Sequence, residues 1–260
     1  MHELPKLTWL EARAALHPRA VCLLPLGATE PHGPHLPLDS DVTIALAMAR
    51  ASGESLARAG IDSVVLPALP FGLTNYTDGF AGWLSLKSGT LWALLEDLIG
   101  SLEQHGARRI VFCNAHLEPA HVQVLRGVAG DHALLEAERA QVLFPDPTRR
   151  RWAGTLGEEF ASGDCHAGRY ETSIVLAHDA PHVRGEHRAL PRVDIGLVAK
   201  MQAGVRSFVA AGADQAYCGD PAKASAEEGR DLVARLAAMV ETTVREAWPD
   251  LYAHGTSNPR

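Results

Sequence analysis

The sequence predicts an α/β fold with a mostly parallel central sheet that is covered by helices on both faces. Short strand-like segments alternate with helix-like segments along the chain, and the strand-like segments are apolar at nearly every position. Strands of this kind are typical of a parallel sheet that is buried on both sides. The length of 260 residues, with 47% apolar and 21% charged side chains, predicts a single domain over residues 1–260.

The first half of the chain contains two strand and helix pairs. Residues 20–26 form an apolar run that predicts the first strand, and residues 42–59 carry apolar side chains at helical spacing. Gly60 ends this helix, and residues 63–69 predict a second strand. A further helix is expected at residues 91–105, where Gly106 follows.

The second half continues the alternation. A third strand is expected at residues 109–113, and a helix follows from residue 118 to 127 with Pro119 in its first turn. The last helix is expected at residues 225–247, because Ser225 and Glu228 have the spacing of a capping box. The polar residues 251–260 are expected to form a frayed tail.

The composition argues against several classes of partner. The formal net charge is −7 and basic residues form no stripe, which argues against a nucleic-acid partner. No apolar run approaches the roughly 20 residues of a membrane span, and no secretory signal precedes the first strand, so we expect a cytoplasmic protein. The four cysteines are scattered, which fits neither a disulfide framework nor a thiolate zinc site.

Two clusters of metal-ligating residues follow predicted strands. Glu30 and His32 come after the first strand, and their two-residue spacing makes their side chains diverge toward two neighbouring ions, which Asp41 could bridge. His116 and Glu118 repeat this spacing after the third strand. Because sites of open α/β folds lie at the carboxyl edge of the sheet, we expect the two clusters to converge.

Two of these carboxylates also have a purely structural interpretation. Asp41 precedes a predicted helix, where an acid is a common cap. Glu118 begins another helix, where the helix dipole favours an acid whatever its function. The spacing of Glu118 from His116 favours the metal interpretation.

The first cluster resembles the signature of the creatininase family. This signature reads Pro-x-Gly-x-x-Glu-x-His-Gly-Pro-His-Leu-Pro-Leu followed closely by Asp, and the chain carries it from Pro25 to Leu38 with Asp41. The stretch from His166 to Ser173 is similar to the family's His-Ala-Gly-x-x-Glu-Thr-Ser element. Gly219-Asp-Pro221 resembles its closing motif, so that motifs occur in family order from about residue 20 to residue 230.

This resemblance implies a three-layer α/β/α sandwich, a centre of two divalent ions and hydrolysis of C–N bonds other than ordinary peptide bonds. It implies that Glu30, Asp41 and His116 hold one ion. It implies that His32, Asp41 and Glu118 hold the other, with Glu171 as a reserve ligand or an orienting catalytic residue. Family members commonly form hexamers, which implies a homo-oligomer.

The charges of the proposed ligands suit two divalent ions. Three carboxylates oppose four positive charges, and a bound hydroxide would neutralise the remaining one. Such a hydroxide, formed because the ions lower the pKa of water to about 7, would attack an amide carbonyl. We expect His166 to move the proton to the leaving nitrogen. Oxygen and nitrogen ligands suit zinc, manganese or iron.

The chain departs from the family pattern around the expected substrate pocket. The family's Gly-x-Ser-x-x-His and Phe-Pro-Gly-Thr become the runs at residues 72–77 and 80–83, so that Thr77 and Trp83 replace a histidine and a threonine. A creatinine pocket is therefore poorly supported. Tyr76 and Trp83 could line an aromatic pocket, although core packing is the alternative for Trp83.

Three functions remain open from the sequence. The main hypothesis is a hydrolase of a small-molecule amide, either a small cyclic amide or a formamide. The family also includes a peptide-trimming branch linked to peptide-derived redox cofactors. The third alternative is a catalytically silent member that binds a metal or a ligand. Three mutually facing carboxylates favour an enzyme over a silent protein, because neither packing nor charge would retain them.

Overall fold

A five-stranded parallel sheet forms the centre of the protein in a computed structural model, which describes residues 1–133 and 139–253. The strands lie in the order β1-β3-β2-β4-β5. All neighbouring strands are parallel, as the sequence predicts. Their bounds are β1 His2–Glu3, β2 Val21–Leu26, β3 Ser63–Val65, β4 Arg109–Asn114 and β5 Gln141–Leu143.

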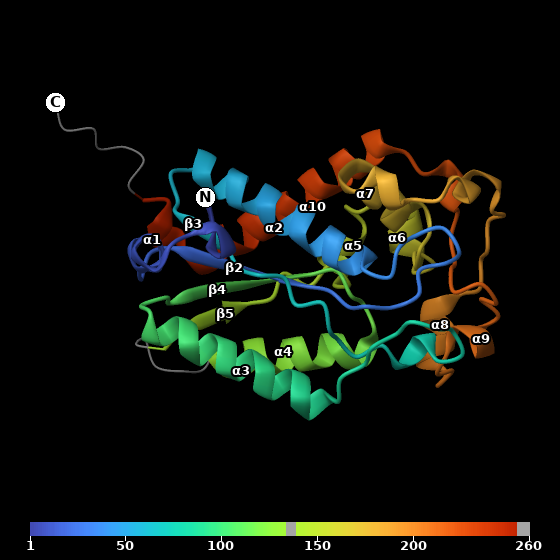
Figure 1. Ribbon diagram of the computed structural model, residues 1–260, viewed down its shortest axis with the longest axis horizontal. Helices are drawn as coiled ribbons and strands as arrows, with labels where there is room; N and C mark the ends of the chain where they lie inside the picture. Colours follow the sequence, from blue (N-terminus) through green and yellow to red (C-terminus); the bar gives the residue numbers. More distant parts are fainter. Residues whose placement is uncertain (134–138, 254–260) are drawn as a thin grey trace.

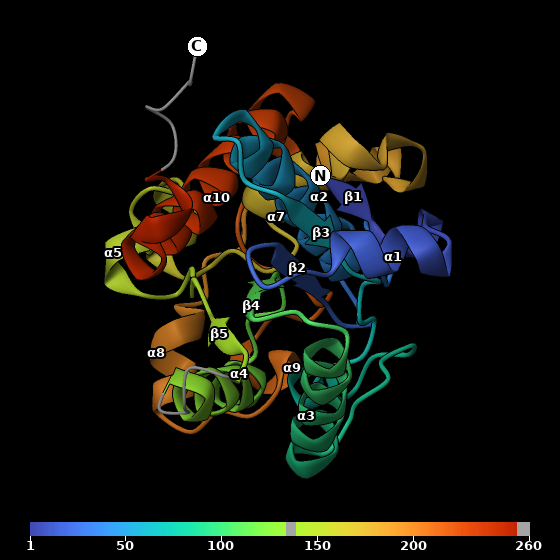
Figure 2. The same ribbon diagram turned by 90° about the vertical axis from the view of Figure 1, so that its left-hand side faces the viewer.

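Helices cover both faces of this sheet and make three layers (Figures 1 and 2). One outer layer holds α2 (Ser40–Arg58), α7 (Arg169–His178) and α10 (Ala226–Ala247). The other holds α3 (Ser88–Gln104) and α4 (Pro119–Ala133). Shorter helices are α1 (Trp9–Ala15), α5 (Arg150–Ala153), α6 (Glu158–Ser162), α8 (Leu197–Gln202) and α9 (Phe208–Ala211). The predicted fold class is therefore confirmed.

The strand side chains alternate between two hydrophobic cores. Val21 and Leu23 of β2 pack with the α2, α7 and α10 layer, whereas Cys22 and Leu24 pack with the α3 and α4 layer. All six residues of β2 are buried, which explains why its sequence shows no alternation of polar and apolar residues. Cys22 thus fills the core, as Cys113 of β4 does on the opposite face.

The backbones of helices α10 and α7 approach each other very closely where the two helices cross. A Cβ atom on Gly229 would lie 1.9 Å from the carbonyl oxygen of Ser173, so only glycine permits this contact between the two backbones. The crossing fixes α7, which carries Glu171 in its first turn.

Several predicted boundaries differ from those observed. The strand expected at 63–69 ends at Val65, because Pro67 lacks the N–H group that would continue the ladder. Leu69 returns to bridge Leu26. The helix expected at 118–127 extends to Ala133. Ser225 caps α10 by accepting from the N–H of Glu228, but the Glu228 carboxylate binds Arg169 and Ser173 instead of completing the capping box.

Two expectations concern the ends and extent of the chain. Most of the tail expected to fray, residues 254–260, lies outside the described residues. The single domain stays a prediction. Among the described helices, none combines the length and the apolar character needed to cross a bilayer.

Candidate metal centre

The predicted ligand clusters meet at the carboxyl edge of the sheet. Leu26, at the end of β2, lies opposite Asn114, at the end of β4, so the loops that follow these strands start side by side. Glu30 and His32 belong to the first loop and His116 to the second. Asp41 lies in the first turn of α2 and makes no cap, since Asp39 occupies the N-cap position. The convergence that the sequence predicts is therefore observed.

Glu30, Asp41 and His116 form the first group of possible ligands. The Nδ1 atom of His116 lies 3.1 Å from a Glu30 oxygen and 2.9 Å from an Asp41 oxygen. One ligand atom from each residue lies within 4.8 Å of the others, which suits a single ion. All three side chains are buried.

His32, Asp41 and Glu171 form the second group. The Nε2 atom of His32 lies 3.3 Å from an Asp41 oxygen and 3.5 Å from a Glu171 oxygen. Asp41 thus contributes to both groups, one oxygen facing each histidine, as a bridging ligand would.

Glu118 lies outside these groups in the part of the chain that the structure describes. Its carboxylate accepts hydrogen bonds from the backbone N–H of Tyr76 at 3.1 Å and from the Asn75 side chain at 3.4 Å. The position expected of Glu118 next to His32 is occupied by Glu171, the residue that the sequence offers as a reserve ligand.

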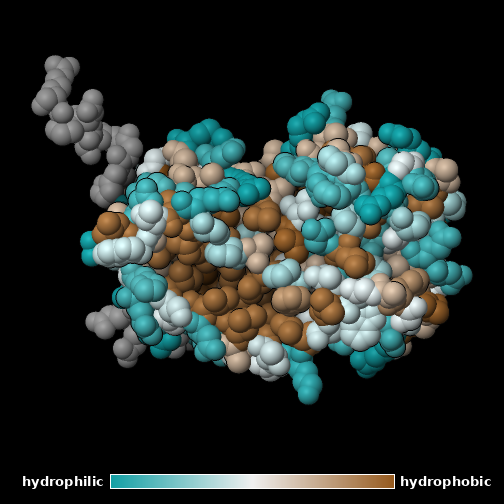
Figure 3. All heavy atoms as spheres, in the orientation of Figure 1, coloured by the Kyte–Doolittle hydropathy of each residue, from teal (hydrophilic) through white to brown (hydrophobic). Residues whose placement is uncertain are grey.

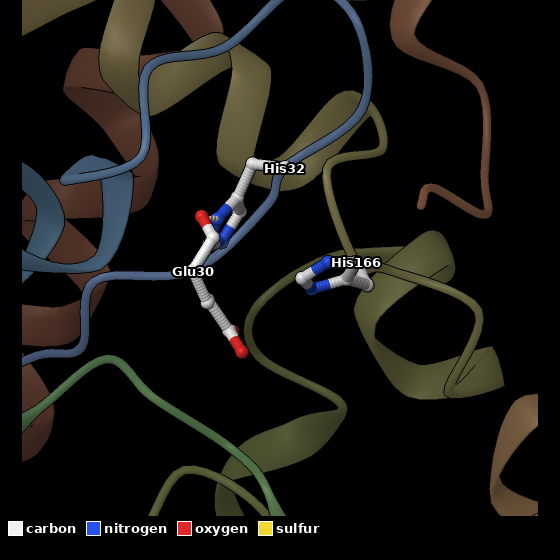
Figure 4. Close-up of side chains that lie close together, drawn as sticks. All are labelled: Glu30, His32 and His166. Atoms are coloured by element: carbon white, nitrogen blue, oxygen red, sulfur yellow. Dashed lines mark hydrogen bonds between the residues drawn. The ribbon is translucent and has the colours of Figure 1, made fainter. Parts of the chain in front are cut away.

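His166 approaches the centre from another segment (Figure 4). Its ring centroid lies 4.5 Å from that of His32, and it forms a third group of possible ligands with Glu30 and His32. The next residue, Ala167, has a positive φ of 50° and donates its N–H to Glu171 at 2.5 Å. Strained backbone of this kind concentrates at functional sites.

Each of the three histidines uses one ring nitrogen to bond a backbone carbonyl oxygen. His32 donates from Nδ1 to Glu30 at 3.0 Å, and His116 donates from Nε2 to Leu73 at 2.6 Å. His166 donates from Nε2 to Pro31 at 3.0 Å. The other nitrogen of each ring is then free to bind a metal or a proton.

The burial of so many acids in one place demands positive charge. Burial lowers the pKa of His32, but Asp41, Glu171 and Glu30 outweigh this effect and raise it to about 10. Burial raises the pKa of Glu171, and the Asp41 carboxylate adds to the effect, while His32 partly offsets it. Divalent cations would balance the negative charge of these carboxylates in place of the protons on His32 and Glu171. The donor set therefore fits the metals that the sequence predicts.

The pKa of His166 shifts in the opposite direction from that of His32. Burial, together with the nearby His32, lowers it to about 4. The imidazole of His166 is therefore neutral at pH 7.

A cavity of about 280 Å³ opens beside these ligands. Glu30, Asp41, Glu118, His166 and Glu171 form its polar side. The remaining wall is mainly apolar and includes Tyr76, Leu117, Phe160, Leu197, Met201 and Phe208.

Part of this wall could not be predicted from the sequence. It consists of Leu197, Met201 and Phe208, which belong to α8 and α9, and the sequence of these two helices contains no motif that indicates a binding site. Phe208 stacks on the ring of His166 with centroids 4.2 Å apart. Of the two aromatic candidates, Tyr76 lines the cavity, whereas Trp83 is half-buried and does not.

Two residues lie behind the ring of His116. His121 is fully buried and packs edge-on against His116 with ring centroids 4.8 Å apart. It bonds Asn114 at 3.0 Å. Asn114 and His121 support the ring of His116 from behind. The feature of the sequence that marks them is the Asn114-x-His116 spacing after an apolar strand.

A buried set of carboxylates and imidazoles, a shared aspartate and an adjoining cavity define a metal-dependent hydrolase of the α/β/α class. The family model described as creatinine amidohydrolase matches residues 5–244. The chain therefore belongs to the creatininase family, and it is a metal-dependent amidohydrolase.

Two relatives illustrate this membership. The chain is 36% identical over 229 residues to the mycofactocin precursor peptide peptidase of Mycobacterium tuberculosis, covering 86% of this chain and 82% of that protein. It is 31% identical over 201 residues to the creatinine amidohydrolase of Pseudomonas putida, covering 66% and 70% respectively.

Solved structures share the fold. The manganese form of creatininase has a TM-score of 0.69 at 24% identity, covering 95% of this chain and 98% of that chain. A putative creatinine amidohydrolase from Bacteroides fragilis also has a TM-score of 0.69, at 22% identity with 98% of both chains covered. A zinc form of a creatininase variant gives 0.69 at 23% identity, covering 95% and 98%.

Proposed function

We propose that this protein hydrolyses a C–N amide bond at a centre of two divalent ions held by Glu30, His32, Asp41, His116 and Glu171. The observation that carries the proposal is Asp41, whose two oxygens face His32 and His116 at 3.3 and 2.9 Å from the floor of a cavity. When bound, two such ions activate water and polarise the amide carbonyl.

The protein's own side chains would divide the remaining work. Hydrolysis adds the hydroxyl of water to the carbonyl carbon, breaks the C–N bond and places a proton on the leaving nitrogen. His166 lines the cavity, and its Nε2 bonds the carbonyl oxygen of Pro31, so its Nδ1 can take the proton from water and return it to nitrogen. Pro31 holds its ring in place by accepting from Nε2, and Phe208 stacks on its face.

Glu118 would then act on the substrate side of the centre. It lines the cavity, and its burial raises the pKa of its carboxyl group. Asn75 and Tyr76 fix it by hydrogen bonds. We therefore infer that Glu118 positions substrate or water, and that Glu171 is the last ligand of the second ion.

The substrate that we propose first is a small-molecule amide, either a small cyclic amide or a formamide. A cavity of about 280 Å³ accommodates such a molecule. A second candidate is a peptide substrate, as the name of the mycobacterial relatives at 33–36% identity suggests for those proteins. The apolar wall formed by Leu197, Met201 and Phe208 favours this second candidate, since it would receive an apolar side chain.

The experiment that tests the function combines metal content with turnover. Protein reconstituted separately with zinc, manganese and iron(II) should bind about two ions per chain. It should release acid from at least one member of a panel of lactams, hydantoins, creatinine, formamides and short peptides. Absence of metal after reconstitution would overturn the proposed centre. Two bound ions without turnover on any amide would instead favour a silent binding protein.

Paired substitutions separate the roles of the two glutamates. Glu171→Gln should lower the metal content toward one ion per chain, because the amide would weaken the group formed with His32 and Asp41. Glu118→Gln should keep two ions and lose turnover instead. Elemental analysis of both variants measures this difference. Loss of an ion from the Glu118 variant alone would restore the assignment that the sequence implies.

We also propose that the chain forms a homo-oligomer. Apolar atoms gather in the middle of the face shown in Figure 3, between the layers of α2 and α3. Exposed apolar side chains include Leu38, Phe71 and Leu84. Such surfaces commonly lie in protein interfaces. Light scattering that finds only monomers at micromolar concentration would contradict this proposal.

The cytoplasmic location stays a prediction, which fractionation of producing cells would test.

A further inference from the structure

The hydroxyl group of Tyr76 is buried without a hydrogen-bond partner among the residues that the structure describes. Tyr76 is 7% exposed and lines the cavity beside the ligands. A buried hydroxyl without a partner is unfavourable, and buried tyrosines usually find one. Tyr217 shows the usual arrangement, because its hydroxyl donates to the carbonyl oxygen of Pro191 at 3.0 Å.

The ring of Tyr76 is held firmly next to the reacting groups. Its backbone N–H donates to Glu118 at 3.1 Å. The ring lies edge-on against Phe208 with centroids 5.0 Å apart and an interplanar angle of 85°. Phe208 stacks in turn on His166. A substrate amide beside His166 would therefore extend along Phe208 toward Tyr76.

We propose that Tyr76 determines specificity by donating a hydrogen bond to a carbonyl oxygen of the substrate that lies beyond the amide to be cleaved. This inference rests on the proposed function. The preferred substrate class is then an amide with a second, neutral carbonyl group and an adjoining apolar group, as in a peptide backbone or a cyclic imide. A simple formamide lacks the second carbonyl.

The charges around Tyr76 support a neutral carbonyl as its partner. Burial raises the pKa of the Tyr76 hydroxyl, as do the nearby Cys218 and Glu118, so the group stays protonated and acts as a donor at neutral pH. A substrate carboxylate at the same place would be repelled by Glu118, whereas a carbonyl oxygen would not.

The test measures binding, so that it does not depend on finding the substrate. Two hydroxamates, which bind divalent ions through their own oxygens, are titrated into metal-loaded protein: N-acetyl-leucine hydroxamate, and an analogue in which an alkyl chain of the same length replaces the acetamido group. The protein should bind the first about tenfold more tightly. Tyr76→Phe should remove this preference and leave the metal content unchanged.

Tyr252→Phe is the matched control. The Tyr252 hydroxyl is likewise buried and without a partner among the described residues, but this ring lies under Arg245 and does not line the cavity. The control variant should keep the tenfold preference. Equal binding of both hydroxamates by the unmodified protein, or an unchanged preference in Tyr76→Phe, would overturn the proposal. Failure of the proposed function would give a different result: the protein would keep its preference for the first hydroxamate but would hydrolyse no amide.

Discussion

Asp41→Ala should lose both ions and fall to background activity. Asp41 is the residue that faces both His32 and His116, so its removal weakens both groups of ligands at once. Burial alone would raise the pKa of Asp41, but the His32 and His116 rings together hold it below its usual value, so the charged form of Asp41 is stabilised in the folded protein. Without Asp41 and the ions, the buried carboxylates of Glu30 and Glu171 would repel each other with no cation between them. The folded protein should therefore also lose stability.

Asp39→Ala is the control for this prediction. Asp39 belongs to the same loop, but it is exposed and makes no capping bond with its side chain. Its replacement should leave metal content and turnover unchanged. The measurements are elemental analysis, turnover on an identified amide and thermal unfolding of both variants. An Asp41 variant that retains two ions would show that Asp41 is not the bridge.

His166→Ala should keep its metal and lose rate. If His166 only transfers protons, turnover should fall by about 10²–10⁴-fold, the usual contribution of a general acid or base. Metal content and thermal unfolding should stay close to those of the unmodified protein. The exposed His105, which follows α3 far along the chain, provides the control substitution His105→Ala, for which no change is expected.

Two different results would contradict the proposed role of His166. His166 can also form a group of possible ligands with Glu30 and His32. Loss of an ion from His166→Ala would make it a ligand and would reopen the assignment of the second ion. Full turnover with full metal content would exclude His166 as the proton carrier.

The sequence predicts the three central strands of the sheet, β3, β2 and β4, and every proposed ligand except Glu171, which it offers only as a reserve. The apolar run that ends at Leu26 and the run that ends at Cys113 predict strands of one parallel sheet, because short buried strands alternate with helices. The structure adds that these two strands are neighbours. Glu30 and His116 follow these ends directly. Their convergence is a consequence of strand direction, which a single sequence can reveal.

The choice between Glu118 and Glu171 could not be made in this way. Both are acids near helix starts, and spacing along the chain favours Glu118 because it lies two residues from His116. The structure brings Glu171 to His32 through the packing of α7, while backbone N–H of Tyr76 holds Glu118 aside. Such contacts depend on tertiary distances, as does the stacking of Phe208 on His166.

The proposed centre would draw its ligands from four separate segments: the loops after β2 and β4, the first turn of α2 and the first turn of α7. None of these segments alone supplies a complete group of possible ligands, so we expect the metal to bind after the chain has folded. Ions would enter a finished protein through the cavity, and unfolding would release both together. Free metal concentration should then set the apparent melting temperature, with each increase in metal concentration shifting the equilibrium further toward the folded chain.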